Sequence, residues 1–192
     1  MNKRRCFWVG ENKPHYNKYH DKEWGVPVHD DRKHFEFLIL EGAQAGLSWE
    51  TILLRRKGYR KAFAHFSAQK VSRFNDKKIK SLLKDKGIIR NRLKVKSAVT
   101  NAQEFLKIQK EFGTFDKYVW SFVGGHTIVN RPRVREDLLM RTKESDALSA
   151  DLKKRGFKFV GSTIIYAYMQ ATGLVNDHMA YCWRSIFSLC TK

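Results

Sequence analysis

The stretch from Gly156 to Cys182 constrains the fold of this chain more than any other. It reads GFKFVGSTIIYAYMQATGLVNDHMAYC: a glycine-containing turn, an apolar helical segment and a final His178-x-x-x-Cys182. A histidine and a cysteine supply half of a four-ligand metal site, and Cys6 with His20 could supply the other half. A metal bound by these four residues would tie the two ends of the chain together.

The chemistry of this ligand set favours zinc. A spacing of four residues places His178 and Cys182 on one face of a helix, and a closed Cys2His2 set is typical of structural zinc. The chain holds seven histidines, so such a spacing also arises by chance. Its cysteines, Cys6, Cys182 and Cys190, are odd in number, which favours thiols or metal ligands over a disulfide framework.

Helical periodicity dominates the sequence, and strand-like alternation is nearly absent. One helix is predicted to begin at a cap formed by Asp30 or Asp31 and to end at a break between Gly42 and Gly46. The next helix is predicted to begin at Ser48 and to end at Gly58. Other predicted helices carry caps at Ser67, at Asn75 or Asp76 and at Ser145, or follow Gly87 and Thr114. The prediction is an all-α fold in one domain covering residues 1–192.

The charge of the chain points to a polyanionic partner. Thirty-eight Lys and Arg against nineteen Asp and Glu leave a formal charge of +19. A basic strip at Lys84 to Lys96 is a candidate phosphate-facing surface, although such runs are as often plain solvated helix faces. High charge can also serve solubility alone.

A helix-hairpin-helix pattern is predicted at about residues 145–173. One helix ends at Arg155, a tight turn runs through Phe159 to Gly161 with Lys158 beside it, and a second helix runs from Ser162 to Thr172. Backbone N–H groups at such a turn and helix start can bind DNA phosphate, although helix-glycine-helix sequences also serve ordinary packing.

Glu41 is predicted at the end of one helix, close to the start of the next at Trp49. The first thirty residues lack a clear period and are predicted as an ordered loop that brings further aromatic residues. A cage of aromatic rings with one carboxylate suits a flat, cationic or donor-rich guest. The alternative is that the rings build the core and Glu41 is exposed. The cage residues are Trp8, Tyr16, Tyr19, Trp24 and Trp49.

Taken together, these residues resemble the 3-methyladenine-DNA glycosylase I family, a zinc-containing branch of the helix-hairpin-helix DNA glycosylases. The resemblance covers nearly the whole chain, in the order and spacing of the family, and is weakest in Gly124 to Lys143 and after Cys182. The matching segments are Arg5 to Val9, Tyr19 to Pro27, Glu41 to Trp49, Gly87 to Arg92, Trp120 to Val123 and Leu152 to His178.

The resemblance implies roles for individual residues. Structural zinc would be bound by Cys6, His20, His178 and Cys182. Glu41 would be the catalytic residue, with the five cage aromatics around the extruded base. DNA would be contacted by Gly46, Leu47, Lys158, Val160, Gly161 and Thr163, with Leu47 filling the gap left in the duplex. The family lacks the catalytic aspartate of its superfamily, so Asp177 is not expected to act as a nucleophile.

The expected activity is hydrolysis of the N-glycosidic bond of 3-methyladenine in double-stranded DNA, by a monofunctional enzyme that leaves an abasic site. Methylation makes the base cationic, so it departs as a neutral molecule without a general acid, and Glu41 would favour its positive charge. A non-catalytic duplex-binding module, an RNA-binding protein and a glycosylase with a shifted lesion preference are the alternatives. With no apolar run of about 18 residues and no signal peptide, we expect an intracellular, cytoplasmic monomer that does not contact membranes.

Overall fold

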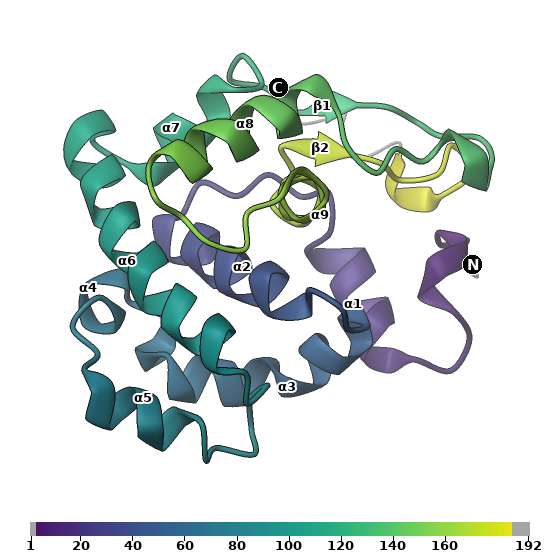
Figure 1. Cartoon of the computed structure of the whole chain (residues 1–192). Coiled ribbons are helices and arrows are strands. Elements are labelled where there is room, and N and C mark those ends of the chain that lie inside the picture. The colour runs from purple at the N-terminus through teal and green to yellow at the C-terminus, as the bar shows by residue number, and fades with distance from the viewer. Residues whose placement is uncertain (1–2, 186–192) are drawn as a thin grey trace.

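The computed structural model describes residues 3–185, and Cys190 lies outside this range. Within it, helices account for nearly all regular structure, as the all-α prediction requires (Figure 1). The α helices are α1 (Pro14–Lys22), α2 (Asp31–Gln44), α3 (Trp49–Ala62), α4 (Ala68–Val71), α5 (Asp76–Leu82), α6 (Arg92–Phe112), α7 (Phe115–Ser121), α8 (Lys143–Lys154) and α9 (Ser162–Ala171). Short 3-10 turns are η1 (Phe7–Val9), η2 (Ala64–Phe66), η3 (Arg135–Asp137) and η4 (Trp183–Ser185).

Four helix starts agree with the predicted capping residues. The side chains of Asp30, Ser48, Ser67 and Asn75 each accept a hydrogen bond from a backbone N–H in the first turn of α2, α3, α4 and α5. A side-chain oxygen at this position satisfies a donor that the helix cannot pair internally. These starts follow from local chemistry, and the prediction of each is confirmed.

Gly42 and Gly58 were expected to interrupt helices, and both expectations are wrong. Gly42 lies inside α2, and Gly58 lies inside α3. A Cβ atom on Gly58 would lie only 2.1 Å from the carbonyl oxygen of Gly87, so this glycine permits two backbones to touch. A Cβ on Gly42 would meet the Cβ of Phe159 at 3.4 Å. The contact at Gly42 is an ordinary van der Waals distance, so only Gly58 is required by close packing of the backbone.

Two further helix starts differ from the prediction. The long helix α6 begins at Arg92 with Asn91 as its N-cap, because the residues from Gly87 form a turn first. The helix α8 is capped by Thr142, whose Oγ1 accepts a hydrogen bond from the backbone N–H of Ser145 at 3.3 Å. Ser145 lies in the first turn, and its Oγ accepts from the backbone N–H of Thr142 at 2.8 Å. This reciprocal pair is a capping box.

The two ends of the chain differ from the prediction more than its middle does. The predicted N-terminal loop contains α1, whose buried face consists of Tyr19 and His20 and not of aliphatic residues. His178 and Cys182 were predicted on one face of a helix, but they lie in a turn after α9, and this turn brings the two side chains together. A parallel pair of two-residue strands, β1 (Ile128–Val129) and β2 (Val175–Asn176), joins the Gly124 to Lys143 excursion to this turn.

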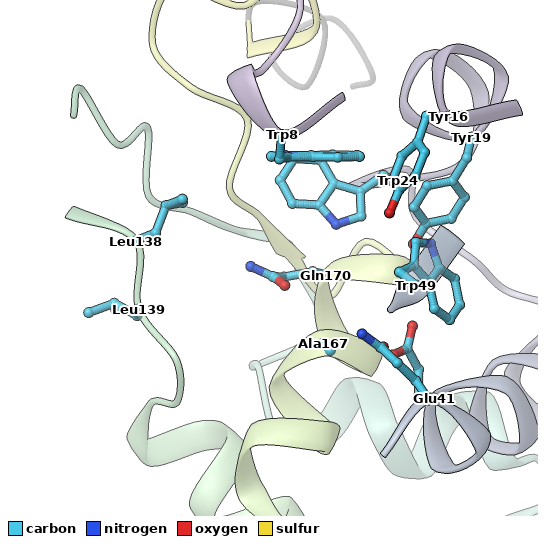
Figure 2. A pocket seen from close by; sticks show the side chains of 11 residues that line it. Trp8, Tyr16, Tyr19, Trp24, Glu41, Trp49, Leu138, Leu139, Ala167 and Gln170 are labelled. Carbon is cyan, nitrogen blue, oxygen red and sulfur yellow. The ribbon is translucent and has the colours of Figure 1, made fainter. Parts of the chain in front are cut away.

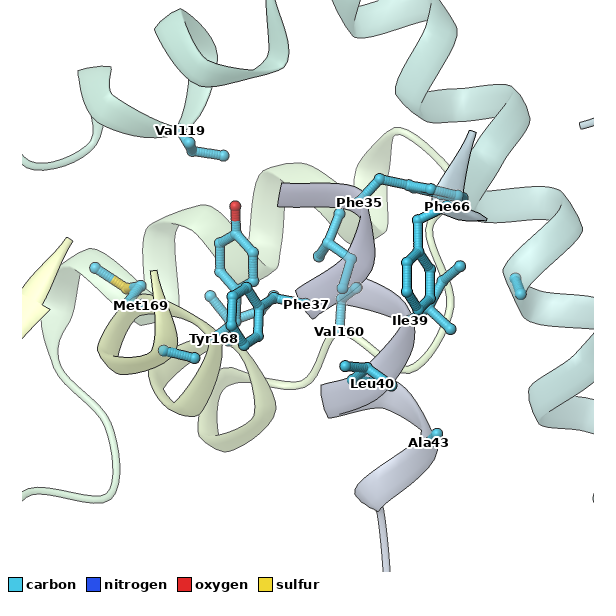
Figure 3. Packing of buried hydrophobic residues seen from close by; sticks show 14 of the residues in the cluster. Phe35, Phe37, Ile39, Leu40, Ala43, Phe66, Val119, Val160, Tyr168 and Met169 are labelled. Atoms are coloured by element: carbon cyan, nitrogen blue, oxygen red, sulfur yellow. The ribbon is translucent and has the colours of Figure 1, made fainter. Parts of the chain in front are cut away.

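The core is organised around α2. All residues from His34 to Ala43 are buried, and α2 contacts α3, α6, α7 and α9. Figure 3 shows Phe35, Ile39 and Leu40 of α2 among side chains of the neighbouring elements. A helix buried on all sides needs every polar residue it carries to be either paired or functional. No helix within residues 3–185 is long and apolar enough to span a membrane.

Candidate active site

A pocket of about 340 Å³ lies between the N-terminal segment, the end of α2 and α9. Figure 2 shows Trp8 and Trp24 facing Gln170, with Tyr16, Tyr19 and Trp49 on one side and Leu138 and Leu139 on the other. The lining residues are Trp8, Tyr16, Tyr19, Trp24, Glu41, Gln44, Trp49, Leu138, Leu139, Ala167 and Gln170. All six pocket residues named from the sequence therefore line one cavity, of a size that suits a small flat guest.

The aromatic wall is held by its own ring contacts. Trp8 packs edge-on against Trp24 with centroids 4.9 Å apart and against Tyr16 at 5.7 Å. Tyr19 packs against Trp49 at 5.4 Å. Tilted and edge-to-face pairs of this kind are mutually attractive and fix the rings. Tyr19 and Trp24 are also buried in the core, so the two alternative roles of the aromatics, core and cage, coincide in these residues.

Glu41 is a buried carboxyl group without a partner. It is 3% exposed, and among residues 3–185 no donor or cation pairs with its side chain. Burial alone raises its pKa to about 8. Glu36, equally buried on the same helix, receives a 2.7 Å hydrogen bond from Arg56. An unpaired carboxyl group at the base of a pocket is suited to a cationic guest, which would supply the missing partner.

Further residues that line the pocket were not predicted from the sequence. Gln44 lies three residues after Glu41 on α2, so helical spacing could have found it. Gln170 and the pair Leu138 and Leu139 come from distant segments and carried no local signal. The Nε1 of Trp49 is buried without a hydrogen-bond partner in the described chain.

A groove of about 240 Å³ continues from the pocket between the loop after α2 and the start of α9. It shares Glu41 and Gln44 with the pocket, and is also lined by Gly46, Leu47 and Thr163. Leu47 remains 40% exposed although it is apolar. A strand whose nucleotide enters the pocket could lie along this groove.

The basic strip has two kinds of residue. Most of its cations are exposed, but Lys94 is half-buried, and its Nζ donates to the backbone carbonyls of Ala43 at 2.9 Å and Ala45 at 2.6 Å. A cation bound to the last carbonyls of a helix stabilises that helix end. Burial lowers the pKa of Lys94. Lys94 therefore holds the loop that carries Leu47 and is not free to face phosphate.

The predicted hairpin is formed by α8, α9 and the turn between them. The side-chain amide of Asn101 in α6 makes two hydrogen bonds with the backbone of this turn. Its Nδ2 donates to the carbonyl of Lys158, and its Oδ1 accepts from the N–H of Lys158. Lys158 and Thr163 are exposed, but the side chain of Val160 is buried, which leaves only its backbone for a ligand.

The start of α9 is open to a ligand. Its N-cap residue, Gly161, provides no side-chain cap, and a Cβ atom on it would meet nothing within 4 Å in the described structure. The N–H groups of an uncapped first turn bind anions, and a missing Cβ allows an anion to approach the backbone closely.

Cys6, His20, His178 and Cys182 form one buried cluster that could hold a metal ion, because their ligand atoms all lie within 4.8 Å of one another. The Sγ of Cys182 lies 3.4 Å from Nε2 of His20 and 3.5 Å from Nδ1 of His178. In a zinc tetrahedron, bond lengths of about 2.3 Å to sulfur and 2.0 Å to nitrogen place such atoms about 3.5 Å apart. The donor set and its spacing fit zinc.

Outer hydrogen bonds orient both imidazole rings of this cluster. Nε2 of His178 lies 3.0 Å from the carbonyl of Trp24, which can only accept, so the lone pair is on Nδ1, toward the cluster. Nδ1 of His20 lies 2.9 Å from Asp21, and Arg5 in turn binds Asp21. Burial opposes this carboxylate, but the hydrogen bonds from Arg5 and His20 lower its pKa to about 2. Such outer partners are typical of metal-binding histidines.

Comparison with known proteins gives one consistent result. The chain matches the sequence profile described as methyladenine glycosylase over residues 8–185. It is 47% identical to DNA-3-methyladenine glycosylase 1 of Escherichia coli (strain K12), with 93% of this chain and 95% of that protein covered.

Solved structures agree. A crystal structure of 3-methyladenine DNA glycosylase I has a TM-score of 0.91 and 45% identity, covering 94% of this chain and 98% of that one. The Staphylococcus aureus enzyme, described with the structural basis of its 3-methyladenine recognition, also has a TM-score of 0.91, at 34% identity over 94% and 96% of the two chains. The expected family is confirmed: this chain belongs to the methyladenine glycosylase family.

Proposed function

We propose that this chain hydrolyses the N-glycosidic bond of 3-methyladenine in double-stranded DNA, releasing the free base and leaving an abasic site. Support comes from the family, from relatives described as DNA-3-methyladenine glycosylases and from the pocket. The enzyme is thus a hydrolase of N-glycosyl bonds. A base in a duplex cannot reach such a pocket, so the nucleotide must first leave the stack, which costs a few kcal/mol and is easier for a damaged pair.

The buried, unpaired Glu41 is the observation that carries this proposal. A carboxyl group held near a pKa of about 8 by burial alone gains most from a guest that brings positive charge or N–H donors. Methylation at N3 gives the nucleotide base a positive charge, which neutral adenine lacks. When the glycosidic bond breaks, the base takes the bonding electrons and departs neutral, while water supplies hydroxide to the sugar carbon and loses a proton. Glu41 therefore selects and orients the base, and no group need protonate it.

The groove beside the pocket suggests how the DNA is held. Leu47, exposed and apolar on a loop fixed by Lys94, would fill the space that the extruded base leaves. On the other side of the groove, the open N-terminus of α9 at Gly161 would bind a backbone phosphate, with Thr163 and Lys158 beside it. The contribution of Val160 would come from its backbone. A charge of +19 adds non-specific attraction to DNA.

A monofunctional reaction is supported by the lining of the pocket. Strand cleavage through a Schiff base needs an amine near the sugar, and none of the described residues that line the pocket is a lysine. We therefore propose that the product is an intact strand with an abasic site.

We propose zinc as the ion of the Cys6, His20, His178 and Cys182 cluster. A closed set of two thiolates and two imidazoles leaves no coordination position for substrate, so the ion would be structural. It would fasten the segment that carries Trp8 and the helix that carries Tyr16 and Tyr19 to the turn after α9. Metal analysis of the purified protein, with Cys182→Ser for comparison, tests both the identity of the ion and its stoichiometry.

The buried hydrophobic residues form one cluster, which supports a single domain for residues 1–192. We further propose that the protein acts as a monomer inside the cell, where its DNA substrate lies. Sedimentation of the free protein and of its DNA complex tests the oligomeric state.

The decisive experiment incubates the purified protein with methylated duplex DNA and identifies released bases by chromatography. We expect 3-methyladenine from the wild type and a loss of at least tenfold from Glu41→Gln, while affinity for undamaged duplex stays unchanged. Glu11→Gln, at an exposed position, is the matched control and should behave as wild type. Release of 3-methyladenine at the wild-type rate by Glu41→Gln would disprove the role of Glu41. No release by the wild type would favour the non-catalytic DNA-binding module.

A further inference from the structure

Asp177 is a buried carboxylate that does not line the pocket but accepts a hydrogen bond from Gln170, which does. Three donors surround it. Nδ2 of Asn130 lies 2.7 Å from Oδ1, while the hydroxyl of Tyr166 and Nε2 of Gln170 each lie 2.6 Å from Oδ2. Both oxygens thus accept hydrogen bonds from neighbouring side chains, which hold the carboxylate in place behind Gln170.

One of the three donors reaches into the pocket. Gln170 lines the cavity, and Figure 2 shows its amide between Ala167 and the tryptophan rings. A carboxylate can only accept, so the amide nitrogen of Gln170 must face Asp177 and its carbonyl oxygen must face away. Among the described residues no donor binds that oxygen. The pairing with Asp177 therefore presents Oε1 of Gln170 to whatever occupies the pocket.

We propose that Asp177 is a positioning residue for base selection, acting through Gln170. By fixing the amide, Asp177 makes Gln170 a permanent acceptor, and Gln170 together with Glu41 makes the pocket select bases that carry N–H donors on their edge. This inference rests on the proposed function and adds to it the residues, Gln170 and Asp177, that recognise hydrogen-bond donors on the edge of the base. Gln170 is neutral, so recognition of the positive charge on the base depends on Glu41.

A pair of lesions separates these two kinds of selection. 3-Methyladenine and 3-methylguanine are both cationic as nucleotides, but adenine carries an amine at C6 where guanine carries a carbonyl oxygen. A carbonyl placed against Oε1 of Gln170 would bring two acceptors together and leave both unsatisfied, which is unfavourable wherever water is excluded. If Gln170 could turn its amide, its NH2 group would donate a hydrogen bond to the guanine carbonyl oxygen instead. Asp177 prevents that turn.

The test measures the rates at which 3-methyladenine and 3-methylguanine leave the same methylated duplex. For Asp177→Asn, which no longer requires a donor from Gln170, we expect about tenfold slower release of 3-methyladenine and a smaller ratio between the two rates. Gln170→Met keeps the length of the side chain but has no amide, and should reduce the ratio as well. The double variant should have the ratio of Gln170→Met alone, because Asp177 acts only through that amide.

Tyr166→Phe is the control for a merely structural role. It removes another donor from Asp177 and should lower the melting temperature while the ratio stays at the wild-type value. A wild-type ratio in Gln170→Met, or in folded Asp177→Asn, would overturn the inference. Additive effects in the double variant would also overturn it. A wild-type protein that releases neither base would instead refute the proposed function, so the two failures are distinguishable.

Discussion

Replacing Glu41 with glutamine separates the contribution of this residue to the reaction from its effect on the fold. The carboxyl group is 3% exposed and has no partner among the described residues, so its ionised form is disfavoured in the folded protein. The unfolded chain solvates the carboxylate fully. A glutamine has nearly the same shape and never ionises. We therefore expect Glu41→Gln to lose activity and to gain stability.

The magnitude follows from the shift in pKa. The pKa rises from 4.5 in the unfolded chain to about 8 in the folded one. Between these values the folded state binds more protons than the unfolded state, so stability falls as pH rises. The penalty that Glu41 imposes is about 1 kcal/mol at pH 5, about 3 kcal/mol at pH 7 and about 5 kcal/mol above pH 9. At pH 7, removing it should raise the melting temperature by roughly 6–12 °C.

Glu36 provides an internal control of opposite sign. It is equally buried on α2, but it binds Nε of Arg56 at 2.7 Å and lies 3.3 Å from Nζ of Lys33. Glu36→Gln leaves the half-buried guanidinium of Arg56 with one carboxylate fewer, so it should destabilise the fold by about 1–3 kcal/mol at pH 7. The same chemical change, five residues apart on one helix, thus has opposite effects.

Urea unfolding followed by far-ultraviolet circular dichroism at pH 5, 7 and 8.5 measures both variants against the wild type. The decisive quantity is the gain in unfolding free energy of Glu41→Gln, which should increase with pH. A gain that is the same at all three values, or a loss of stability at pH 7, would refute the assignment of Glu41 as a buried and unpaired carboxyl group.

Four other outcomes are expected. If the ionised form of Glu41 selects the base, the kcat/KM of base release by the wild type should rise with pH up to about 8, the pKa of the free enzyme, and a profile that falls over this range would contradict this. Gly161→Ala should leave the melting temperature unchanged, because its Cβ meets nothing, yet weaken duplex binding severalfold in a fluorescence titration; unchanged affinity would argue against a phosphate there. Lys94→Met should slow base release by about tenfold, because the loop that carries Leu47 loses its anchor, while calorimetry should show that free 3-methyladenine still binds. Equal losses in both assays would assign Lys94 to the pocket itself. Cys182→Ser, or removal of metal by a chelator, should lower the melting temperature by several degrees and weaken base binding, and a metal-free wild type of full stability would rule out a structural ion.

Much of this molecule was determined by local sequence. The caps at Asp30, Ser48, Ser67 and Asn75 depend on a side chain and a backbone N–H only three residues away, so no tertiary contact is needed to predict them. The family resemblance named all six pocket residues and the four members of the metal cluster, which the fold brings together from both ends of the chain.

Only the tertiary structure decided how residues far apart in sequence share a contact. Gly58 was predicted to end a helix and Gly87 to precede one, but the contact between their two backbones could not be predicted from either position alone. In the sequence, Lys94 is one of several cations in a basic strip, and only the structure shows that its Nζ binds carbonyl groups at the end of α2. The α1 helix was missed because its buried face is aromatic and polar, and only the pocket and the metal cluster give that face something to pack against.

The same distinction holds at the site. The sequence determined that Glu41 belongs to an aromatic pocket, because residue type and order carry that information. Its pKa, the amide orientation of Gln170 and the three donors of Asp177 depend on burial and on distances between distant segments. Electrostatic and hydrogen-bond energies depend on those distances and on the exclusion of water, and neither is fixed until the chain has folded.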